Sequence, residues 1–135
     1  EKRLRKGALL AGKTVPPLFA GPPKGDLLLV GFGSTKEVIE EARGILAEEG
    51  RYAAAVHLRQ VWPFPAKEIA EIVPRYAAVL TVENNATGQL ARLIRRECGV
   101  RVDGTISRCD GLPFTPGELA SEAGRRIWEN RSIPG

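Results

Sequence analysis

Three short apolar segments, each followed by a polar loop and a helical pattern, restrict the fold of this 135-residue chain more than any other feature. The segments are Leu27–Val30, Ala53–Leu58 and Ala77–Val82. Each has the length of a strand, and continuous apolar runs are typical of strands that are covered on both faces. Because the connections are helical and long enough for crossovers, we predict an α/β fold in which a mainly parallel sheet has right-handed crossovers and helices on both faces.

The connection after the first core strand contains a complete helix pattern. Its apolar residues recur at helical spacing, at Val38, Ile39, Ala42, Ile45 and Leu46. Ser34 and Glu37 have the spacing of a capping box at the start of this helix, and Gly50 has the position of a helix stop. The sequence therefore predicts a helix that begins directly after the Gly31–Ser34 turn.

Further elements follow from the same signals. Helices are predicted at residues 66–73 and from after Gly88 to near Gly99. A last helix opens at Thr115–Glu118, where threonine is the cap and proline lies in the first turn. Val100–Ile106 is predicted as a fourth core strand. A short edge strand is predicted near Leu18–Phe19, within a proline-rich stretch that cannot form an inner strand.

The beginning of the chain differs in composition from the rest. We predict a linker and approach segment at residues 1–25 and one domain at residues 26–135. Four of the first six residues are cationic, and no apolar stretch has the length of a signal peptide core or of a membrane span. The sequence contains no methionine and starts with Glu1, so we expect it to be a piece of a longer polypeptide.

Charge and cysteine content narrow the classes of function. The formal net charge is +4, but the basic residues are spread over several predicted helices and are interleaved with acidic ones. No aromatic residues alternate with them as in a base-stacking surface, so nucleic-acid binding is not predicted. Cys98 and Cys109 form no Cys-x-x-Cys motif, and we interpret them as free thiols in a reducing, cytoplasmic compartment rather than as ligands of zinc or an iron–sulfur cluster.

The turn from Gly31 to Thr35 is the first candidate site. Its sequence, GFGST, lies between a strand and a helix, where glycines let the backbone approach an anion and free N–H groups can bind it. The match to a dinucleotide-binding motif is incomplete, because Lys36 replaces the third glycine and the second strand ends in His57 and Arg59 instead of a carboxylate. We favour a glycine-tightened structural turn and keep an anion or interface role as the alternative.

The second candidate is a loop that follows the second core strand. It is predicted to form an interface through His57, Arg59, Gln60, Trp62 and Phe64. His57 is the only histidine, so no histidine pair can bind a metal, and we interpret it as structural. The prolines on either side of Phe64 reduce the entropy that the loop loses on ordering, which favours packing against another domain over catalysis.

The third candidate is the segment that joins the third core strand to a basic helix. Here the strand leads into Glu83, Asn84 and Asn85, and helix periodicity begins after Gly88. Asparagine tolerates left-handed backbone geometry, so turn requirements alone can explain the pair. We do not predict catalysis by Glu83.

These loops are expected to meet. If Leu27–Val30 lies between the other two core strands, the sheet has its switch point beside it, and a crevice opens at the carboxyl ends of the strands. The residues predicted to line this crevice are Gly31, Gly33, Ser34, Thr35, Glu83, Asn84, Asn85, Gly88 and Gln89. We expect it to receive a partner segment or a small anion, with Glu83 and the asparagines fixing the loop through backbone hydrogen bonds.

Taken together, the motifs LLLVGFGST, HLRQVWPFP, VENNATGQLARLIRR and RVDGTISRCDGLPFTP resemble the C-terminal region of the α subunit of 2-oxoacid:ferredoxin oxidoreductases, especially the 2-oxoglutarate (KorA-type) enzymes. The resemblance extends from Lys2 to about Glu118. More distantly, the chain is similar to the transketolase C-terminal domain. That resemblance implies a three-layer α/β/α fold whose five-stranded sheet has one antiparallel edge strand, which would lie in the proline-rich start of the chain.

The resemblance also implies a function. Family enzymes decarboxylate a 2-oxoacid on thiamine diphosphate with magnesium, pass electrons through iron–sulfur clusters to ferredoxin, and form acyl-coenzyme A. It implies that the cofactors bind outside this segment, in the rest of the α subunit and in the β subunit, and that these and further small subunits are its partners. By this reasoning the segment is an inactive assembly and positioning domain, and 2-oxoglutarate is the expected substrate of the whole enzyme.

Two other classes remain open from the residues themselves. One is a free-standing protein of flavodoxin-like architecture that uses the GFGST turn to bind an anion or a nucleotide. The other is a purely regulatory anion-binding module. A long α/β region preceding this chain would favour the subunit interpretation.

Overall fold

The computed structural model describes residues 16–59, 64–83, 89–107 and 114–129, which form one five-stranded sheet and its covering helices. The strands are β1 Leu18–Ala20, β2 Gly25–Phe32, β3 Ala53–Leu58, β4 Tyr76–Glu83 and β5 Gly104–Ser107. The helices are α2 Lys36–Glu48, α3 Ala66–Ile72, α4 Gln89–Cys98 and α5 Pro116–Gly124, with short 3₁₀ turns η1 Gly33–Thr35 and η2 Val73–Arg75 and a π-helical turn η3 Arg125–Glu129. None of the helices in these ranges is long and apolar enough to cross a membrane.

The strand order is β1-β3-β2-β4-β5, and β1 is antiparallel to β3 while all other neighbours are parallel. The predicted fold class is therefore confirmed, including the antiparallel edge strand in the proline-rich start. β1 lies inside the predicted approach segment of residues 1–25 and pairs with the sheet, whereas the boundary at residue 26 stays a prediction.

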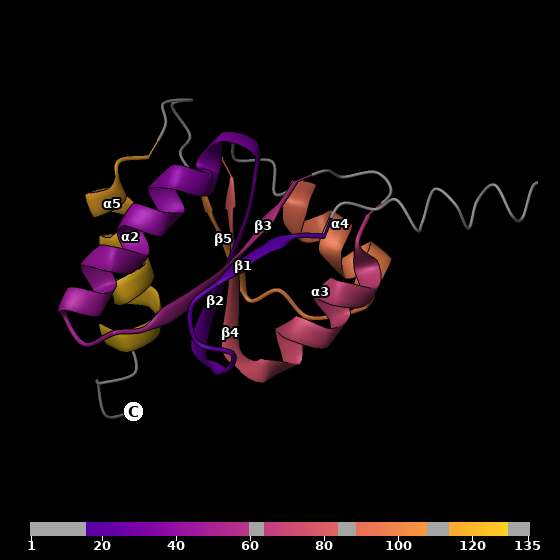
Figure 1. Cartoon of the computed structure of the whole chain (residues 1–135), viewed down its shortest axis with the longest axis horizontal. Helices are drawn as coiled ribbons and strands as arrows, with labels where there is room; N and C mark the ends of the chain where they lie inside the picture. Colours follow the sequence, from indigo (N-terminus) through magenta and orange to yellow (C-terminus); the bar gives the residue numbers. More distant parts are fainter. Residues whose placement is uncertain (1–15, 60–63, 84–88, 108–113, 130–135) are drawn as a thin grey trace, which may run out of the picture.

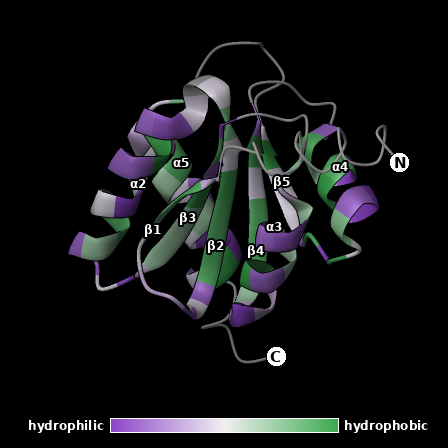
Figure 2. Ribbon diagram, turned by 45° about the vertical axis from the view of Figure 1, so that its right-hand side comes forward, coloured by the Kyte–Doolittle hydropathy of each residue, from purple (hydrophilic) through white to green (hydrophobic). Residues whose placement is uncertain are grey.

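Three layers are visible in Figure 1, where α2 and α5 cover one face of the sheet and α3 and α4 cover the other. The hydropathy view in Figure 2 shows the strands as the apolar centre of the molecule and the polar residues on the outer faces of the helices. This arrangement explains why the core strands have continuous apolar sequences, because both of their faces are covered.

Strand β2 lies at the centre of both cores. Leu27 and Leu29 pack under α2 and α5, whereas Leu28 and Val30 pack under α3 and α4, and all four are fully buried. Burying one such side chain contributes roughly 1.5–3 kcal/mol. The GDLLLVGF segment therefore holds the two helical layers to a common sheet, and it fixes where the following turn emerges.

Two boundaries differ from the sequence prediction. The predicted strand Val100–Ile106 is wrong at its start, because β5 begins only at Gly104. In place of a strand, the Asp103 carboxylate accepts a hydrogen bond from the Val79 amide at 2.7 Å, and Arg101 donates to backbone carbonyls at the start of β4. The Asp103 and Arg101 side chains thus form hydrogen bonds with backbone groups of β4 that a longer β5 would otherwise pair with.

The start of α2 also differs. The N-cap residue is Thr35, not Ser34, so the predicted Ser34–Glu37 capping box is wrong, because η1 inserts a 3₁₀ turn first. The capping box at the last helix is confirmed, since Thr115 Oγ1 accepts from the Glu118 amide and the Glu118 carboxylate accepts from the Thr115 amide, each at 3.1 Å. The π-helical turn that follows α5 is absent from the sequence prediction.

Candidate functional site

The switch point of the sheet lies between β2 and β4. From β2 the chain crosses to β3 on one side, and β4 then lies on the other side of β2. Val30 pairs with Thr81, which puts Phe32 and Glu83, two residues further along each strand, at the same end of the sheet. The helices α2 and α4 begin at this end and leave over opposite faces (Figure 1). The predicted strand arrangement is thus confirmed.

The glycines of the β2–α2 turn are explained by packing and backbone conformation. A Cβ atom at Gly31 would lie 2.4 Å from Ile39 Cδ1 and 2.5 Å from Thr35 Oγ1, so only glycine lets α2 approach the sheet this closely. Gly33 has φ +71°, which favours glycine. The buried Thr35 hydroxyl accepts from the Phe32 amide at 3.1 Å and closes the turn. This geometry supports the structural interpretation of the turn and requires no ligand.

Glu83 occupies the end of β4 and is buried, with 9% of its surface exposed. Its carboxylate accepts a hydrogen bond from the Ala91 amide at 3.4 Å, in the first turn of α4. A carboxylate at a helix N-terminus is stabilised by the free N–H groups and the helix dipole. Glu83 therefore ties the start of α4 to β4. Gln89 is the exposed first residue of α4, and Asn84, Asn85 and Gly88 lie outside the described residues.

The loop after β3 is described only in part. Arg59 is exposed, and Phe64 is half-buried against the core under α3 and α4, whereas Gln60 and Trp62 lie outside the described residues. His57 lies on the opposite face of the sheet, beside Lys36 and Glu40 of α2. The structure thus separates two of the residues that the sequence grouped into one interface loop.

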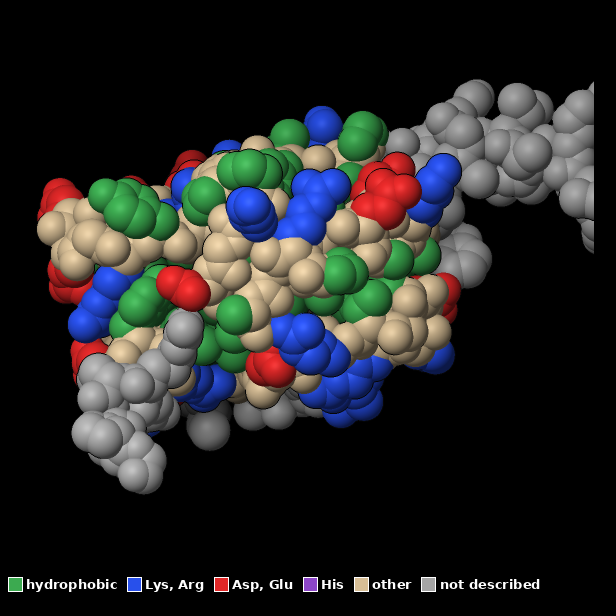
Figure 3. Space-filling view, turned by 90° about the horizontal axis from the view of Figure 1, so that it is seen from below, with side chains coloured by type: hydrophobic (Ala, Val, Ile, Leu, Met, Phe, Trp, Pro, Cys, Tyr) green, Lys and Arg blue, Asp and Glu red, His purple; other side chains and the backbone are tan. Residues whose placement is uncertain are grey.

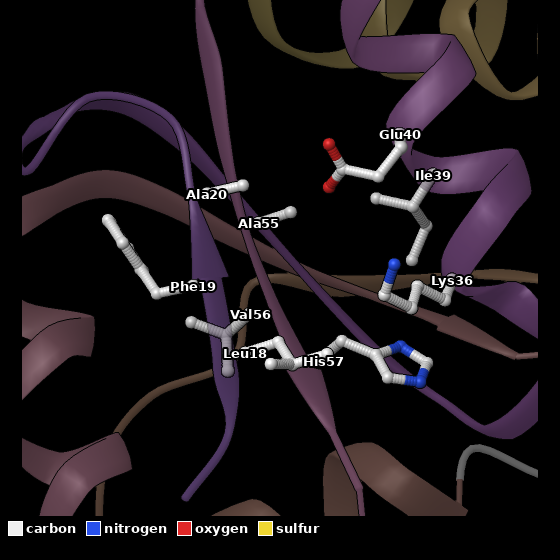
Figure 4. A pocket seen from close by; sticks show the side chains of 9 residues that line it. All are labelled: Leu18, Phe19, Ala20, Lys36, Ile39, Glu40, Ala55, Val56 and His57. Atoms are coloured by element: carbon white, nitrogen blue, oxygen red, sulfur yellow. The ribbon is translucent and has the colours of Figure 1, made fainter.

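His57 belongs to a hollow of about 230 Å³ at the β1 edge of the sheet. Its apolar wall contains Ala20, Ile39 and Ala55, and Figure 4 shows the Glu40 carboxylate and the Lys36 ammonium reaching into the space above β3. Neither Lys36 nor Glu40 is a predicted site residue, although their spacing of four residues on one helix face is a signal that could have paired them.

The electrostatics of this hollow centre on His57. The Nδ1 atom of His57 is buried and has no hydrogen-bond partner among the described residues. Burial lowers the pKa of His57, the nearby Lys36 charge lowers it further, and Glu40 partly opposes them. These effects favour the neutral imidazole, and its buried nitrogen faces a space that another group could enter.

A second depression, an open groove of about 600 Å³, lies between β5 and α5. Its apolar floor is formed by Ile106 and Phe114, and its polar groups include Glu122 and Arg126. These are already engaged, since Arg126 Nε donates to Glu122 at 2.7 Å and Arg126 Nη1 donates to the Thr105 carbonyl at 3.0 Å. The charged groups of Glu122 and Arg126 in this groove therefore already have partners within the domain.

Metal and cluster ligands are not assembled within residues 16–59, 64–83, 89–107 and 114–129, where no three His, Cys, Asp or Glu side chains are grouped to hold a metal ion. Cys98 is half-buried in α4, and burial, followed by the charge of Glu97, raises the pKa of its thiol to about 11. Among the described residues, Cys98 is not part of a group of three or more potential metal ligands.

Comparison with known proteins gives consistent matches. The profile of the family "Pyruvate:ferredoxin oxidoreductase core domain II" matches residues 25–119. The 2-oxoglutarate oxidoreductase subunit KorA of Mycobacterium tuberculosis is 39% identical over 127 residues, which cover 93% of this chain and 18% of that protein. The chain thus spans less than a fifth of the length of this curated relative.

Solved structures agree with these matches. A 2-oxoglutarate:ferredoxin oxidoreductase from Magnetococcus marinus, solved with 2-oxoglutarate, coenzyme A and succinyl-CoA bound, superposes with a TM-score of 0.83 and 28% identity, over 93% of this chain and 22% of that chain. A transketolase from Pichia stipitis superposes with a TM-score of 0.66 and 19% identity, over 91% of this chain and 19% of that chain. The second likeness shows the fold alone and confirms the predicted transketolase C-terminal-like architecture.

Proposed function

This chain belongs to the family of pyruvate:ferredoxin oxidoreductase core domain II, and from that membership we propose that it is an assembly and positioning domain in the α subunit of a thiamine-diphosphate-dependent 2-oxoacid:ferredoxin oxidoreductase. The observation that carries the proposal is the superposition on such an enzyme over 93% of the chain. The whole enzyme would oxidatively decarboxylate a 2-oxoacid to acyl-coenzyme A and reduce ferredoxin.

The proposed substrate is 2-oxoglutarate. Two proteins to which the chain is similar carry this substrate in their names, one by sequence and one by structure. Thiamine diphosphate, magnesium, the iron–sulfur cluster and coenzyme A would bind in the rest of the enzyme, and the partners would be the remainder of the α subunit, the β subunit and any further small subunits. The free thiol of Cys98 is compatible with the reducing cytoplasm that such an enzyme requires.

A positioning role agrees with what the described polar groups do. The Glu83 carboxylate holds the start of α4, and Thr35 closes the turn before α2, so both groups shape the backbone at the carboxyl ends of the strands. We propose that the crevice at this end receives a partner segment or a small anion. An Asn84→Ala, Asn85→Ala double variant of the complete enzyme that assembles and turns over normally would contradict this use of the crevice.

The proposed function is tested by an activity assay on two samples, the complete enzyme and this chain alone. Each is supplied with thiamine diphosphate, magnesium, coenzyme A, a viologen acceptor and either 2-oxoglutarate or pyruvate. We expect substrate-dependent viologen reduction only from the complete enzyme. We expect its rate to be at least about tenfold higher with 2-oxoglutarate than with pyruvate, which corresponds to a difference of ~1.4 kcal/mol in activation free energy.

The controls for this assay decide between the alternatives. Sustained reduction by this chain alone would contradict the positioning role, and a preference for pyruvate would contradict the substrate assignment. Tight binding of phosphate or a nucleotide by this chain alone would favour a free-standing anion-binding protein. Such binding would shift the amide NMR signals of Gly33 and Lys36 at the start of α2.

A further inference from the structure

Within the described part of the chain, the β1 edge of the sheet exposes two large apolar side chains. Leu18 and Phe19 are each 41% exposed, although large apolar side chains are usually buried. Figure 4 shows them projecting from opposite sides of β1. In the described part of the chain β3 is the only strand that pairs with β1, so the other backbone edge of β1 is open. An open, apolar edge strand is a surface on which another polypeptide can dock.

The size of the adjoining hollow limits what can enter it. Its volume of about 230 Å³ lies below the roughly 300–1,000 Å³ of sites that enclose a drug-sized ligand or cofactor. One or two amino-acid side chains fit this space. Its apolar wall of Ala20, Ile39 and Ala55 adjoins Leu18, so an apolar side chain that enters would extend the core beneath α2.

The polar groups of the hollow specify the charge of the occupant. Glu40 is already paired with Arg43, whose guanidinium is 2.6 Å from the Glu40 carboxylate. Lys36 makes no ion pair with any described residue, and His57 Nδ1 has no hydrogen-bond partner there. The hollow therefore offers an ammonium group and an imidazole nitrogen, and a carboxylate can accept hydrogen bonds from both.

We propose that the β1 edge and this hollow dock a segment from the remainder of the α subunit, in which a carboxylate side chain lies next to a branched apolar side chain. The apolar side chain enters the hollow against Ile39 and Leu18, and the carboxylate pairs with Lys36 and His57. The inference rests on the proposed function, because that function supplies the longer polypeptide from which the segment comes.

Docking would also change the titration of His57. The charged groups that affect His57 in this structure are Lys36 and Glu40, and its pKa lies below the ordinary value because of burial and the Lys36 charge. A carboxylate held beside the ring favours the imidazolium form, so occupation of the hollow raises this pKa. The histidine therefore reports on whether the site is filled.

The test measures side-chain accessibility in the complete enzyme. Leu18→Cys and Tyr52→Cys variants are labelled with a maleimide, and mass spectrometry of the peptides measures the rate at each position. Tyr52 is the matched control, because it is 62% exposed in this structure and lies away from the hollow, before β3. We expect the cysteine at position 18 to react at least about tenfold more slowly than the cysteine at position 52.

Charge reversal then tests the carboxylate. Lys36→Glu places a negative charge where the docked segment needs a positive one, and Lys67→Glu makes the same change at another exposed position, in the first turn of α3. We expect Lys36→Glu to restore fast labelling at position 18 and Lys67→Glu to leave it slow. Equal effects of the two reversals would overturn the role of Lys36.

The remaining outcomes are also decisive. Fast labelling at position 18 in an enzyme that turns over a 2-oxoacid overturns the docking site and leaves the proposed function intact. Slow labelling in an enzyme without 2-oxoacid activity supports the docking site while contradicting the proposed function. Protection that appears only at high enzyme concentration identifies a second copy as the occupant and overturns the proposal.

Discussion

The two edges of the sheet differ in whether apolar or polar side chains lie on them. At one edge, the three-residue strand β1 exposes Leu18 and Phe19 and leaves the hollow beside His57 open. At the other, β5 is attached to β4 by a hydrogen bond of 2.8 Å between the Thr81 and Thr105 hydroxyls, and Arg126 covers the outer carbonyl of Thr105. Arg126 thus holds a carbonyl of β5, while large apolar side chains are exposed at β1.

This difference separates structural polar groups from available ones. At the β5 edge, Arg126 is fixed by Glu122 and by the sheet itself, so its charge helps to prevent the edge from pairing with other chains. At the β1 edge, the ion pair between Glu40 and Arg43 also holds β3, since Arg43 donates to the Ala53 carbonyl at 2.8 Å. Lys36 and His57 are left for a partner.

Figure 3 shows the end of the molecule at which β3 and β4 begin, opposite the end where Phe32 and Glu83 lie. Lys and Arg side chains lie there in separate groups, with acidic and apolar side chains between them. The net charge of +4 therefore does not create one continuous basic surface on this face.

The largest effect is expected from Gly21→Ala, which tests how the β1 edge is attached. Gly21 has φ +102°, and a Cβ atom there would lie 2.7 Å from Arg43 Nη2 and 2.8 Å from the Ala54 Cα. Strain and crowding together are expected to lower the free energy of unfolding by about 3 kcal/mol or more. The measurement is chemical unfolding followed by circular dichroism.

Gly50→Ala is the matched control for that variant. Gly50 also has a positive φ, +78°, but a Cβ atom there would meet no atom within 4 Å. Only the backbone strain remains, so about 1 kcal/mol is expected. Equal losses for both glycines would show that β1 is not closely packed against β3 through Gly21.

An intermediate effect is expected from Arg126→Met, which uncovers the β5 edge. The change removes the hydrogen bond to the Thr105 carbonyl and the pairing with Glu122, and we expect a loss of about 1–2 kcal/mol in the free energy of unfolding. Arg125→Met is the control, because Arg125 contacts the same glutamate but is more exposed, and less than about 0.5 kcal/mol is expected. A larger loss of unfolding free energy for Arg125→Met than for Arg126→Met would contradict the conclusion that Arg126 stabilises the β5 edge.

The same pair predicts a dependence on acid. Burial alone would raise the pKa of Glu122, but hydrogen bonds from Arg126 and Arg125 outweigh it, so the pKa lies below the ordinary value of 4.5. The stability that Glu122 contributes is therefore present above pH 4.5 and is lost as the pH falls through its lower folded value. We expect the stability difference between the wild type and Arg126→Met to shrink over that range.

The smallest effect concerns His57 at the β1 edge. Because burial and Lys36 lower its pKa from 6.5, the folded chain resists protonation more than the unfolded chain does. Its contribution to stability is complete above pH 6.5 and decreases as the pH falls through the folded value. Unfolding measurements between pH 5 and 7 are expected to show this decrease in the wild type and its absence in His57→Gln. An identical pH profile in both would mean that the hollow does not depress the pKa of His57.

Much of the fold could be predicted from local patterns. The bounds of β3 agree with the predicted segment, and the central residues of β2 and β4 were also predicted as strands. Short continuous apolar runs are typical of strands that are buried on both faces. The stop of the first helix at Gly50 and the capping box at Thr115 are also local signals, and the structure confirms both. The start of β5 was not predictable, because it depends on Asp103 reaching the backbone of β4, 24 residues away.

The candidate site was predictable only in outline. The positions of Gly31 and Glu83 at strand ends follow from the sequence, and parallel pairing brings those ends to one side of the sheet. The hydrogen bond from the Ala91 amide to Glu83 could not be foreseen, since it requires α4 to return across the sheet face at a particular angle. Nor could the sequence separate His57 from Phe64, because a strand alternates its faces but a loop does not.

By itself, the sequence determined the α/β class, the family resemblance and the buried strands, because these depend on the spacing and polarity of neighbouring residues. The tertiary structure decided which polar groups have hydrogen-bond or ion-pair partners within the domain. Arg126, Asp103 and Glu83 have partners that lie 8 to 24 residues away, whereas Lys36 and His57 line a hollow between three elements. Whether a charged or polar group is satisfied depends on distances of a few ångströms between distant segments, and only the packed chain fixes those distances.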